Sequence, residues 1–427
     1  MNNVKIAIIA DDLTGASDCG GQLVHYGLNV FVKIEAEECT ERQTSDAVIF
    51  NTDSRSMPAA RAETAVKKIS KQISQTSFDV VYKKIDSTMR GNIGAELNAM
   101  YEVFRPDFVV IAPGYPKNGR QVIGGIHYVN GTELHKTEAA NDPKTPVTES
   151  NIQRLIEKQT GQKCGHLTYE DIRKGSGHLR KKLDDFRAGG MTYVTADSVY
   201  ESDLERLAFM HVDLPYSMIL AGSAGLMSCL PKAFNLKERP LNQSVPPDSL
   251  PVLFVVGSVS QTGRMQLCEL FAADMAEKVE MMSESVLIGE AAKRKEFKRL
   301  KERAAEAWRH SKNIVLCSSD NLIETREIGR KRGLTSIQTS DAVSAALGEL
   351  AGELIQELAV KRLFLTGGDT AYQVLHQFQI REIRLLDEVE PGIPLGTAGE
   401  DLYIVTKAGN FGSRSAITNA AIKLQGG

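Results

Sequence analysis

The stretch 5–16 constrains the fold more than any other, because an apolar run there ends in two adjacent acids. Residues 5–10 (KIAIIA) are long enough for one buried strand, and Asp11 and Asp12 follow directly, before a helical pattern begins. In an open α/β sheet, ligands bind at the carboxyl edge of the strands, where loops meet helix N-termini. One alternative is that an acid only caps the next helix. A cap needs one acid, and adjacent acids repel each other, so the pair predicts a ligand site.

The order of apolar run, turn and helical pattern repeats along the chain, which is typical of a doubly wound sheet. A polar, proline-rich stretch at 242–251 interrupts it and suits a stiff, extended linker. Since 427 residues exceed the usual size of a single core, we expect an α/β protein of two doubly wound domains with mostly parallel sheets, 1–241 and 252–427, and an active site in the cleft between them. The expected strands are 5–10, 46–50, 78–84, 108–112, 191–195, 217–221, 252–256, 313–317, 362–366 and 402–407, and the expected helices are 15–27, 58–75, 92–104, 201–211, 260–275, 340–359 and 370–378.

Composition narrows the classes of function. A net charge of −3 and a pI near 6.3 give no reason to expect nucleic acid as a partner. No apolar run approaches the roughly 20 residues of a membrane span, so no membrane is expected as a partner. The six cysteines are scattered without metal or redox spacing, which fits a reduced, cytoplasmic protein.

Two more polar groups follow expected strands in the first half. Residues 51–55 (NTDSR) end in a guanidinium, and residues 83–92 (KKIDSTMRGN) combine bases, an acid and hydroxyls. The carboxyl ends of parallel strands share one edge, so both groups should lie beside the two acids. Guanidinium and ammonium groups suit a carboxylate, and Ser, Asn and Asp suit hydroxyls, which predicts a small polyhydroxy acid as ligand. The alternative is a solvated loop in which Asp86 or Ser87 caps helix 92–104.

A third segment, 112–131, is dominated by proline and glycine and predicts irregular structure after strand 108–112. It is either a lid over the site or a hairpin that closes an oligomer, so a homodimer stays open. Its His127 is expected to be structural rather than a catalytic base.

The second half carries a different chemistry. Paired glycines at 367–368 open a helix, where backbone N–H groups and the helix dipole favour an anion. Two further Gly/Ser-rich loops follow strands 252–256 and 402–407, and together the three predict a polyphosphate cradle. The P-loop and GxGxxG patterns are absent from the sequence. A charged crevice in one domain and phosphate loops in the other predict a kinase acting on a small hydroxy acid.

These motifs make the chain resemble the four-carbon acid sugar kinases. The matching pieces are residues 10–18 (ADDLTGASD), 51–55, 82–96 (YKKIDSTMRGNIGAE), 111–131, 367–370 (GGDT), 391–394 (PGIP) and 409–412 (GNFG). The resemblance implies an N-terminal sugar-acid-binding domain, a C-terminal ATP-binding domain, and phosphorylation at the terminal O4. The sequence KKIDSTMRGN looks like the D-threonate and D-erythronate branch rather than the 3-oxo-tetronate branch, and 137–147 leans toward D-threonate.

Residues and resemblance together give the candidate sites. The candidate acid-binding residues are Asp11, Asp12, Arg55, Lys83, Lys84, Ile85, Asp86, Ser87 and Arg90. The candidate ATP-binding residues are Ser258, Gly367, Gly368, Asp369, Thr370, Gly409 and Asn410.

The hypothesis is in-line transfer of the ATP γ-phosphoryl group to the 4-hydroxyl of the acid, with Mg²⁺ neutralising phosphate charge. The candidate bases are Asp12 and Asp86, with Asp369 as a rival, and Asp11 is a candidate metal or water-shell ligand. Lys84 and Arg55 would anchor the substrate carboxylate. The alternatives are D-erythronate as substrate, an NAD-dependent hydroxy-acid dehydrogenase, and a non-catalytic sugar-acid sensor.

Overall fold

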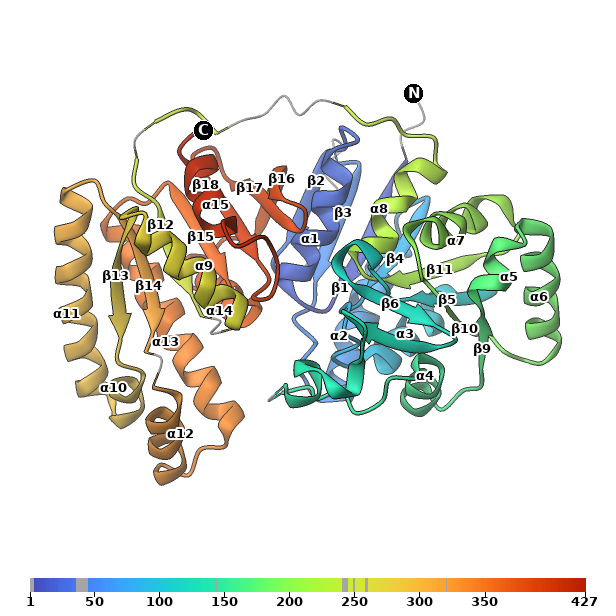
Figure 1. The fold of residues 1–427 in the computed structure, drawn as a ribbon, viewed down its shortest axis with the longest axis horizontal. Coiled ribbons are helices and arrows are strands. Elements are labelled where there is room, and N and C mark those ends of the chain that lie inside the picture. The colour runs from blue at the N-terminus through green and yellow to red at the C-terminus, as the bar shows by residue number, and fades with distance from the viewer. Residues whose placement is uncertain are drawn as a thin grey trace. The chain divides into compact units, whose positions relative to one another are not determined.

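The structure, a computed structural model, describes residues 4–35, 45–142, 144–239, 245–248, 250–257, 260–319 and 321–427. The chain divides into two compact units, Met1–Pro240 and Leu241–Gly427, and each is an α/β layered domain (Figure 1). Part of the expected linker (242–244 and 249) and the candidate ATP-binding residue Ser258 lie outside the described residues.

The first unit is built on a parallel sheet. Its strands are β1 (Ile6–Ala10), β2 (Val30–Lys33), β3 (Ala47–Asn51), β4 (Val80–Lys84), β5 (Phe108–Ala112), β9 (Cys164–Leu167), β10 (Tyr193–Ala196) and β11 (Met218–Gly222). They lie in the order β2-β3-β1-β4-β11-β5-β10-β9, and each of these neighbours pairs in parallel. Because the strands are covered on both faces, they read as nearly continuous apolar runs in the sequence.

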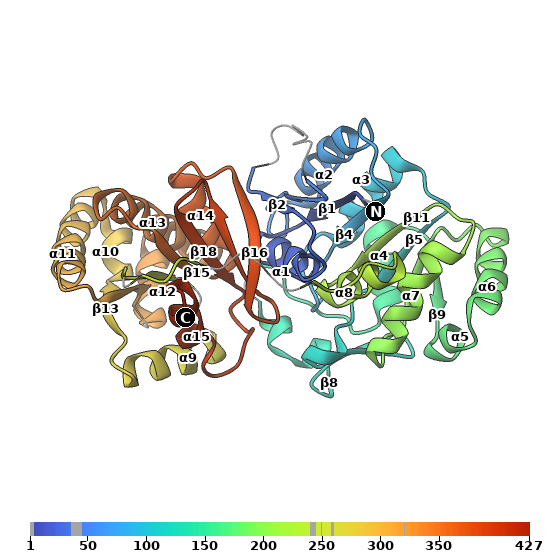
Figure 2. The ribbon, with the colours of Figure 1, turned by 90° about the horizontal axis from the view of Figure 1, so that it is seen from above.

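Helices cover both faces of this sheet (Figure 2). Packed side by side on one face are α1 (Leu13–Val24), α7 (Glu201–Asp213) and α8 (Ala224–Ala233), and on the other α2 (Ala59–Ile73), α3 (Ile93–Phe104) and α4 (Ile152–Thr160). The helices α5 (Tyr169–Arg173) and α6 (Ser176–Ala188) pack against α7. Alternate strand residues such as Ile9, Phe50 and Ile111 form one buried core with Val66 of α2 and Leu97 of α3.

The proline- and glycine-rich segment is more regular than expected. It forms a small antiparallel sheet of β6 (Arg120–Ile123), β7 (Ile126–Val129) and β8 (Thr132–Glu133), flanked by the short helices η1 (Pro116–Asn118), η2 (Leu134–Lys136) and η3 (Glu138–Asn141). Gly124 and Gly125 both have positive φ, of 58° and 77°, as a two-residue hairpin turn requires. The expectation of irregular structure is therefore wrong, and of the two alternatives the hairpin describes the local geometry.

The second unit is also α/β, with an antiparallel margin. Its strands are β12 (Leu253–Val256), β13 (Ala276–Met281), β14 (Asn313–Ser318), β15 (Arg362–Thr366), β16 (Glu382–Glu390), β17 (Ile393–Ala398) and β18 (Leu402–Lys407). They follow the order β13-β14-β12-β15-β18-β17-β16, parallel from β13 to β18 and antiparallel beyond it.

The helices of the second unit again form two layers. On one face lie α9 (Gln261–Ala272) and α15 (Ala416–Leu424), and on the other α10 (Ser283–Ile288), α11 (Glu290–Arg309), α12 (Leu322–Lys331), α13 (Ser336–Glu357) and α14 (Gly368–Gln377). The elements between 276 and 312, which are β13, α10 and α11, were not expected from the sequence. The largest of them, α11, is rich in charge and buries few of its side chains.

The second half of the expected linker packs onto the second unit instead of running free. Val245 is buried within the apolar core of that unit. Asp248 forms an ion pair with the buried guanidinium of Arg362. One apolar side chain and one ion pair thus hold residues 245–248 against the second unit.

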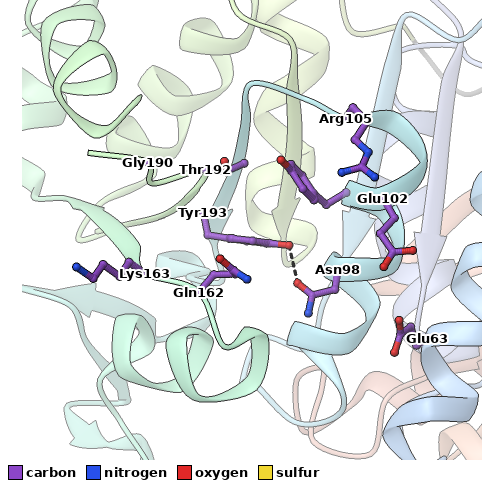
Figure 3. A pocket seen from close by; sticks show the side chains of 10 residues that line it. Glu63, Asn98, Glu102, Arg105, Gln162, Lys163, Gly190, Thr192 and Tyr193 are labelled. Atoms are coloured by element: carbon purple, nitrogen blue, oxygen red, sulfur yellow. Dashed lines mark hydrogen bonds between the residues drawn. The ribbon is translucent and has the colours of Figure 1, made fainter. Parts of the chain in front are cut away.

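Two further observations concern the membrane-spanning potential of the helices and a cavity in the first unit. Within the described part of the chain, no helix combines the length and the apolar character needed to cross a bilayer. A cavity of about 350 Å³ lies in the first unit, lined by Asn98, Tyr101, Arg105, Lys163 and Tyr193 among others (Figure 3). It opens where β5 and β10 begin, at the amino edge of the sheet, and contains none of the candidate site residues.

His127 of β7 is fully buried, and its ring nitrogens have no hydrogen-bond partner among the described residues. Burial lowers its pKa from 6.5 to about 4. The unfolded chain therefore binds the proton first as the pH falls, and stability is lost between about pH 6.5 and pH 4.

We expect His127→Phe to remove this loss. On lowering the pH from 7 to 5, the wild type should lose about 2 kcal/mol more unfolding free energy than the variant. Urea unfolding followed by circular dichroism measures the difference. The matched variant of an exposed histidine, His310→Phe, should keep the wild-type pH dependence. Equal losses in the wild type and His127→Phe would contradict the buried neutral histidine.

Candidate functional site

The carboxyl ends of three neighbouring strands bring the expected acid-binding residues together. Ala10 at the end of β1 pairs with Asn51 of β3 on one side and with Lys84 of β4 on the other. The residues that follow each strand therefore leave the sheet at one level. This register explains why three groups far apart in sequence share one edge.

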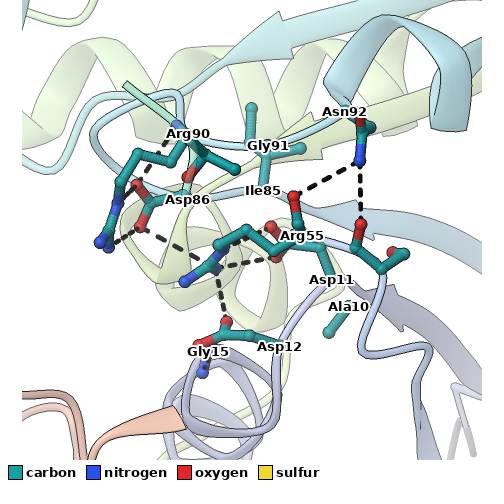
Figure 4. A network of polar contacts seen from close by, with 12 residues as sticks. Ala10, Asp11, Asp12, Gly15, Arg55, Ile85, Asp86, Arg90, Gly91 and Asn92 are labelled. Atoms are coloured by element: carbon teal, nitrogen blue, oxygen red, sulfur yellow. Dashed lines mark hydrogen bonds and ion pairs between the residues drawn. The ribbon is translucent and has the colours of Figure 1, made fainter. Parts of the chain in front are cut away.

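Arg55 is the centre of the resulting network (Figure 4). Its Nε and Nη2 donate to Asp11 at 2.7 and 3.0 Å, and Nη2 also donates to Asp12 at 2.5 Å. The same Nη2 lies 3.9 Å from Asp86. Burial would lower the pKa of Arg55, but the three acids hold it well above its ordinary value. One guanidinium thus offsets part of the repulsion among three carboxylates.

Burial and the surrounding cations act in opposite directions on Asp11. Desolvation alone would raise its pKa, but Arg55, Lys83 and Lys84 lower it below the ordinary value. Asp11 is therefore an ionised acceptor, nearly inaccessible to solvent and already held by Arg55.

Asp12 has two functions in the fold. It precedes α1 and accepts from Gly15 N at 3.1 Å, so it is the helix cap that the simpler alternative required. It also accepts from Arg55 and from the Thr14 hydroxyl, the latter at 2.7 Å. Capping and membership of the polar cluster are thus combined in one residue.

Asp86 lies in a second clamp. Arg90 donates to both carboxylate oxygens at 2.7 and 3.1 Å, and also to Asp142 at 3.1 Å. Burial would raise the pKa of Asp86, but Arg90 and Arg55 hold it well below its ordinary value. The alternative in which Asp86 or Ser87 caps the following helix is wrong, since α3 begins after Asn92 without a side-chain cap.

Lys83 and Lys84 point to opposite faces of β4, as successive strand residues do. Lys83 is fully buried and its ammonium lies 2.8 Å from Glu96 of α3 and donates to the Lys84 carbonyl. Burial raises the pKa of Glu96, and Lys83 opposes this. Lys83 is therefore held by an internal ion pair with Glu96, and its charge also acts on Asp11.

Lys84 is also buried, but its partner is weaker. Its Nζ donates to the Ile85 carbonyl at 3.0 Å, and no carboxylate of the described residues lies within ion-pair distance. A Cβ at Gly15 would lie 2.7 Å from this Nζ and 2.4 Å from Asp12 Oδ1. The absence of a side chain at Gly15 thus lets the ammonium and the carboxylate approach α1.

Ile85 and Ser87 differ in the hydrogen-bonding groups that they can offer to a ligand. Ile85 is buried, and both its backbone groups are used, the N–H by the Gly222 carbonyl and the carbonyl by Lys84. Ser87 is largely buried, and its hydroxyl has no hydrogen-bond partner within the part of the chain that the structure describes. Of the two, only Ser87 offers a polar group to a ligand.

The second unit aligns its three candidate loops in the same way. Thr366 at the end of β15 pairs with Val256 of β12 and with Lys407 of β18. Helix α14 then begins after Gly367, which has φ 95° and gives the helix no side-chain cap. Gly368, Asp369 and Thr370 therefore form an uncapped first turn, where a helix attracts anions.

A close approach holds this turn against the loop after β12. A Cβ at Gly257 would lie 1.7 Å from the Thr370 hydroxyl oxygen, so only glycine fits. Gly409 and Asn410 follow β18 at the same edge. The structure therefore brings together the described candidates of this half.

The comparisons with known proteins also divide the chain into two domains. Residues 6–230 match the model of a sugar-binding N-terminal domain, and residues 253–417 that of a nucleotide-binding C-terminal domain. The chain belongs to the four-carbon acid sugar kinase family. It is an ATP-using phosphotransferase, which replaces the dehydrogenase and sensor alternatives.

Two related proteins and one solved structure show what this kinase is similar to. It is 33% identical to a D-threonate kinase of Salmonella typhimurium, covering 98% of this chain and 97% of that one. It is 28% identical to a 3-oxo-tetronate kinase of Pseudomonas fluorescens, covering 99% and 97%. A solved structure from Salmonella typhimurium LT2, of a protein provisionally named a tRNA synthase, has a TM-score of 0.80 at 25% identity, covering 97% and 98%.

Sequence reasoning missed several residues that support the site of the kinase. Glu96, Thr14, Thr88 and Asp142 bind the expected residues but were not singled out themselves. Glu96 had a signal, because it stands on the same helical face as the buried Ile93 and Leu97. Asp142 had none, since its contact with Arg90 spans 52 residues.

Substitutions in the buried Lys83–Glu96 ion pair test how much this pair contributes to the stability of the protein. Removing one partner leaves the other charge buried and unpaired, so Glu96→Gln should destabilise the protein by about 3–5 kcal/mol. The double variant Lys83→Met, Glu96→Leu should recover most of that loss, because both charges are replaced by apolar groups. Urea unfolding of the three proteins provides the comparison. A single variant as stable as the wild type would show that the pair is not needed.

Proposed function

We propose that the protein transfers the γ-phosphoryl group of ATP to the 4-hydroxyl of D-threonate. The first unit would hold the acid and the second the nucleotide. The likeness to a D-threonate kinase at 33% identity supports this substrate, and D-erythronate is the alternative from the same branch. Cytoplasmic location and a homodimer stay predictions.

Lys84 carries the proposal. A buried ammonium whose described partner is one carbonyl is expensive to desolvate unless an anion completes its shell. The neighbouring acids do not contact it directly, because Asp11, Asp12 and Asp86 hydrogen-bond to Arg55 and Arg90 instead. A substrate carboxylate beside Lys84 would supply the charged hydrogen-bond acceptor that the ammonium lacks.

The remaining groups suit the hydroxyls of the acid. The Ser87 hydroxyl can donate or accept, and the clamped carboxylates keep lone pairs for hydroxyl donors. Arg55 and Arg90 hold these carboxylates in fixed positions, so the hydroxyls would be read by geometry. A neutral sugar would give Lys84 no carboxylate acceptor and bind less well.

The proton of the 4-hydroxyl is better accepted by Asp12 than by Asp86. Asp86 is held by Arg90 through both oxygens, and its lowered pKa makes it a weak base. We therefore assign Asp86 to positioning Arg55 and Arg90, and Asp12 to the proton.

The second unit would hold the ATP phosphates through backbone donors. The first turn of α14 has no side-chain cap, so it offers the N–H groups of Gly368 and Thr370 and the positive end of the helix dipole. This makes Asp369 part of the nucleotide cradle rather than a base. Gly409 and Asn410 would contribute from the neighbouring strand end.

Mg²⁺ is proposed as the metal of the reaction, where it would neutralise charge on the transferred phosphate. The described residues contain no group of three His, Cys, Asp or Glu side chains placed to hold a metal. In such sites the metal is held mainly by phosphates, water and one or two carboxylates. The ion would therefore arrive with ATP.

A panel of four-carbon acids tests the substrate. In an ADP-release assay with Mg²⁺, kcat/KM for D-threonate should exceed that for D-erythronate and 3-oxo-tetronate by about tenfold or more, since hydroxyl-reading sites discriminate strongly. A higher value for 3-oxo-tetronate would overturn the assignment. Release of ADP at the same rate with and without every acid would contradict the proposed transfer.

Lys84→Met tests the carboxylate contact. Loss of a charged hydrogen bond of about 1.5–3 kcal/mol should raise KM for the acid by more than tenfold and leave KM for ATP nearly unchanged. Lys181→Met, which removes an exposed lysine of α6, is the matched control and should behave as the wild type. A rise confined to the KM for ATP would contradict the division of roles between the units.

A further inference from the structure

The loop after β18 has its carbonyl oxygens turned toward buried side chains. Of residues 408–413, all except Asn410 have a carbonyl that accepts a hydrogen bond from a side chain. This is unusual for a surface loop, whose carbonyls ordinarily bond to water. Two fully buried residues, Lys407 and Gln266, supply most of the donors.

Lys407 uses its whole ammonium on this loop. Its Nζ donates to the carbonyls of Ala408, Gly409 and Phe411 at 2.9, 2.9 and 3.1 Å. An ammonium has three protons, so three carbonyls satisfy it. No carboxylate among the described residues forms an ion pair with it.

Gln266 of α9 secures the other half of the loop. Its Nε2 donates to the carbonyls of Phe411, Gly412 and Ser413 at 3.0, 3.4 and 2.7 Å. The Ser260 hydroxyl adds a bond to the Gly409 carbonyl at 2.8 Å. The loop is thus hydrogen-bonded to α9 and to the end of β18 through its carbonyl groups.

The amide groups of the loop are left for another partner. The N–H groups of Gly409, Asn410 and Gly412 have no acceptor among the described residues, and these residues are partly or fully exposed. Gly409 and Asn410 are successive, and successive backbone N–H groups are a common anion site, whereas the Phe411 N–H donates to the Ala408 carbonyl. The loop leaves the sheet at the same edge as the uncapped turn of α14.

We infer that Lys407 and Gln266 are positioning residues that fix the 408–413 loop with its carbonyls inward, so that its amides and the buried positive charge receive the ATP phosphates. The inference rests on the proposed nucleotide site in the second unit. Gln266 shows that a neutral amide can hold such carbonyls. The ammonium adds a charge, which a polyphosphate would favour.

The protonation of Lys407 can be measured. Burial lowers the pKa of Lys407 from 10.5 to about 8, and Glu390 is the described acid that opposes this. Glu390 itself accepts from Ser413 and Asn419 at the far end of the loop. Phosphates bound above the ammonium would favour its protonated form, so binding at pH 8 should take up protons.

The test measures ATP binding by titration calorimetry at pH 8, in two buffers of different ionisation enthalpy. The wild type should take up about half a proton per ATP, because Lys407 is about half protonated at that pH. Lys407→Met should abolish the uptake and weaken ATP binding by about tenfold or more. The exposed Lys361→Met should match the wild type in both respects. Proton uptake equal in wild type and Lys407→Met would overturn the inference.

Further readouts separate positioning from loss of folding and from failure of the proposed function. Gln266→Met should weaken ATP binding without changing the proton uptake, and both variants should bind the acid as the wild type does, since the first unit is untouched. If Lys407→Met fails to fold, the wild-type uptake and Lys407→Arg decide: Arg keeps the charge and should retain most of the affinity. ATP binding by the wild type with unchanged affinity in the folded variants overturns this inference alone. A wild type that binds no ATP overturns the proposed nucleotide site itself.

Discussion

The ion cluster around Arg55 is the constraint on which the first unit depends. Asp11, Asp12 and Asp86 all reach one sheet edge, and their mutual repulsion would be severe in a buried setting. A single guanidinium, bonded to two of them and 3.9 Å from the third, makes this density of charge tolerable. Arg90 then occupies Asp86 from the other side. The carboxylates are thereby fixed as hydrogen-bond acceptors.

Because successive residues of a strand point to opposite faces of the sheet, the adjacent Lys83 and Lys84 have different surroundings. Lys83 turns to the face covered by α3 and is neutralised by Glu96, while Lys84 turns toward Gly15 of α1. Buried ion pairs contribute little net stability, so the first of these mainly fixes the position of β4. The second leaves an ammonium that donates to the Ile85 carbonyl and for which we propose a substrate carboxylate as partner. The second unit repeats the theme with Lys407, whose ammonium is surrounded by carbonyls instead of carboxylates.

Sequence patterns predicted the strands that place the site, because buried parallel strands read as apolar runs. Strand 5–10 appears as Ile6–Ala10, and the adjacent acids follow it as expected. The pattern could not reveal that Lys83 faces inward, since both faces of such a strand are buried and polarity does not mark them. Asp142 and Gln266 reach their partners through contacts over 52 and more than 140 residues, which local patterns do not encode. The helix α11 was missed because its surface is charged and its apolar stripe narrow. The hairpin at 120–129 was hidden by prolines and glycines that signal turns but not the strands between them.

The central claim is that the acid binds through the Lys84 ammonium at the Arg55-centred cluster. A crystal structure of the protein with D-threonate tests it directly. We predict the substrate carboxylate within about 3 Å of Lys84 Nζ, with a hydroxyl of the acid on Asp12 and the Arg55 clamp unchanged. An acid bound elsewhere, or bound at this edge with its carboxylate on Arg90 and Lys84 still facing only the Ile85 carbonyl, would contradict the account.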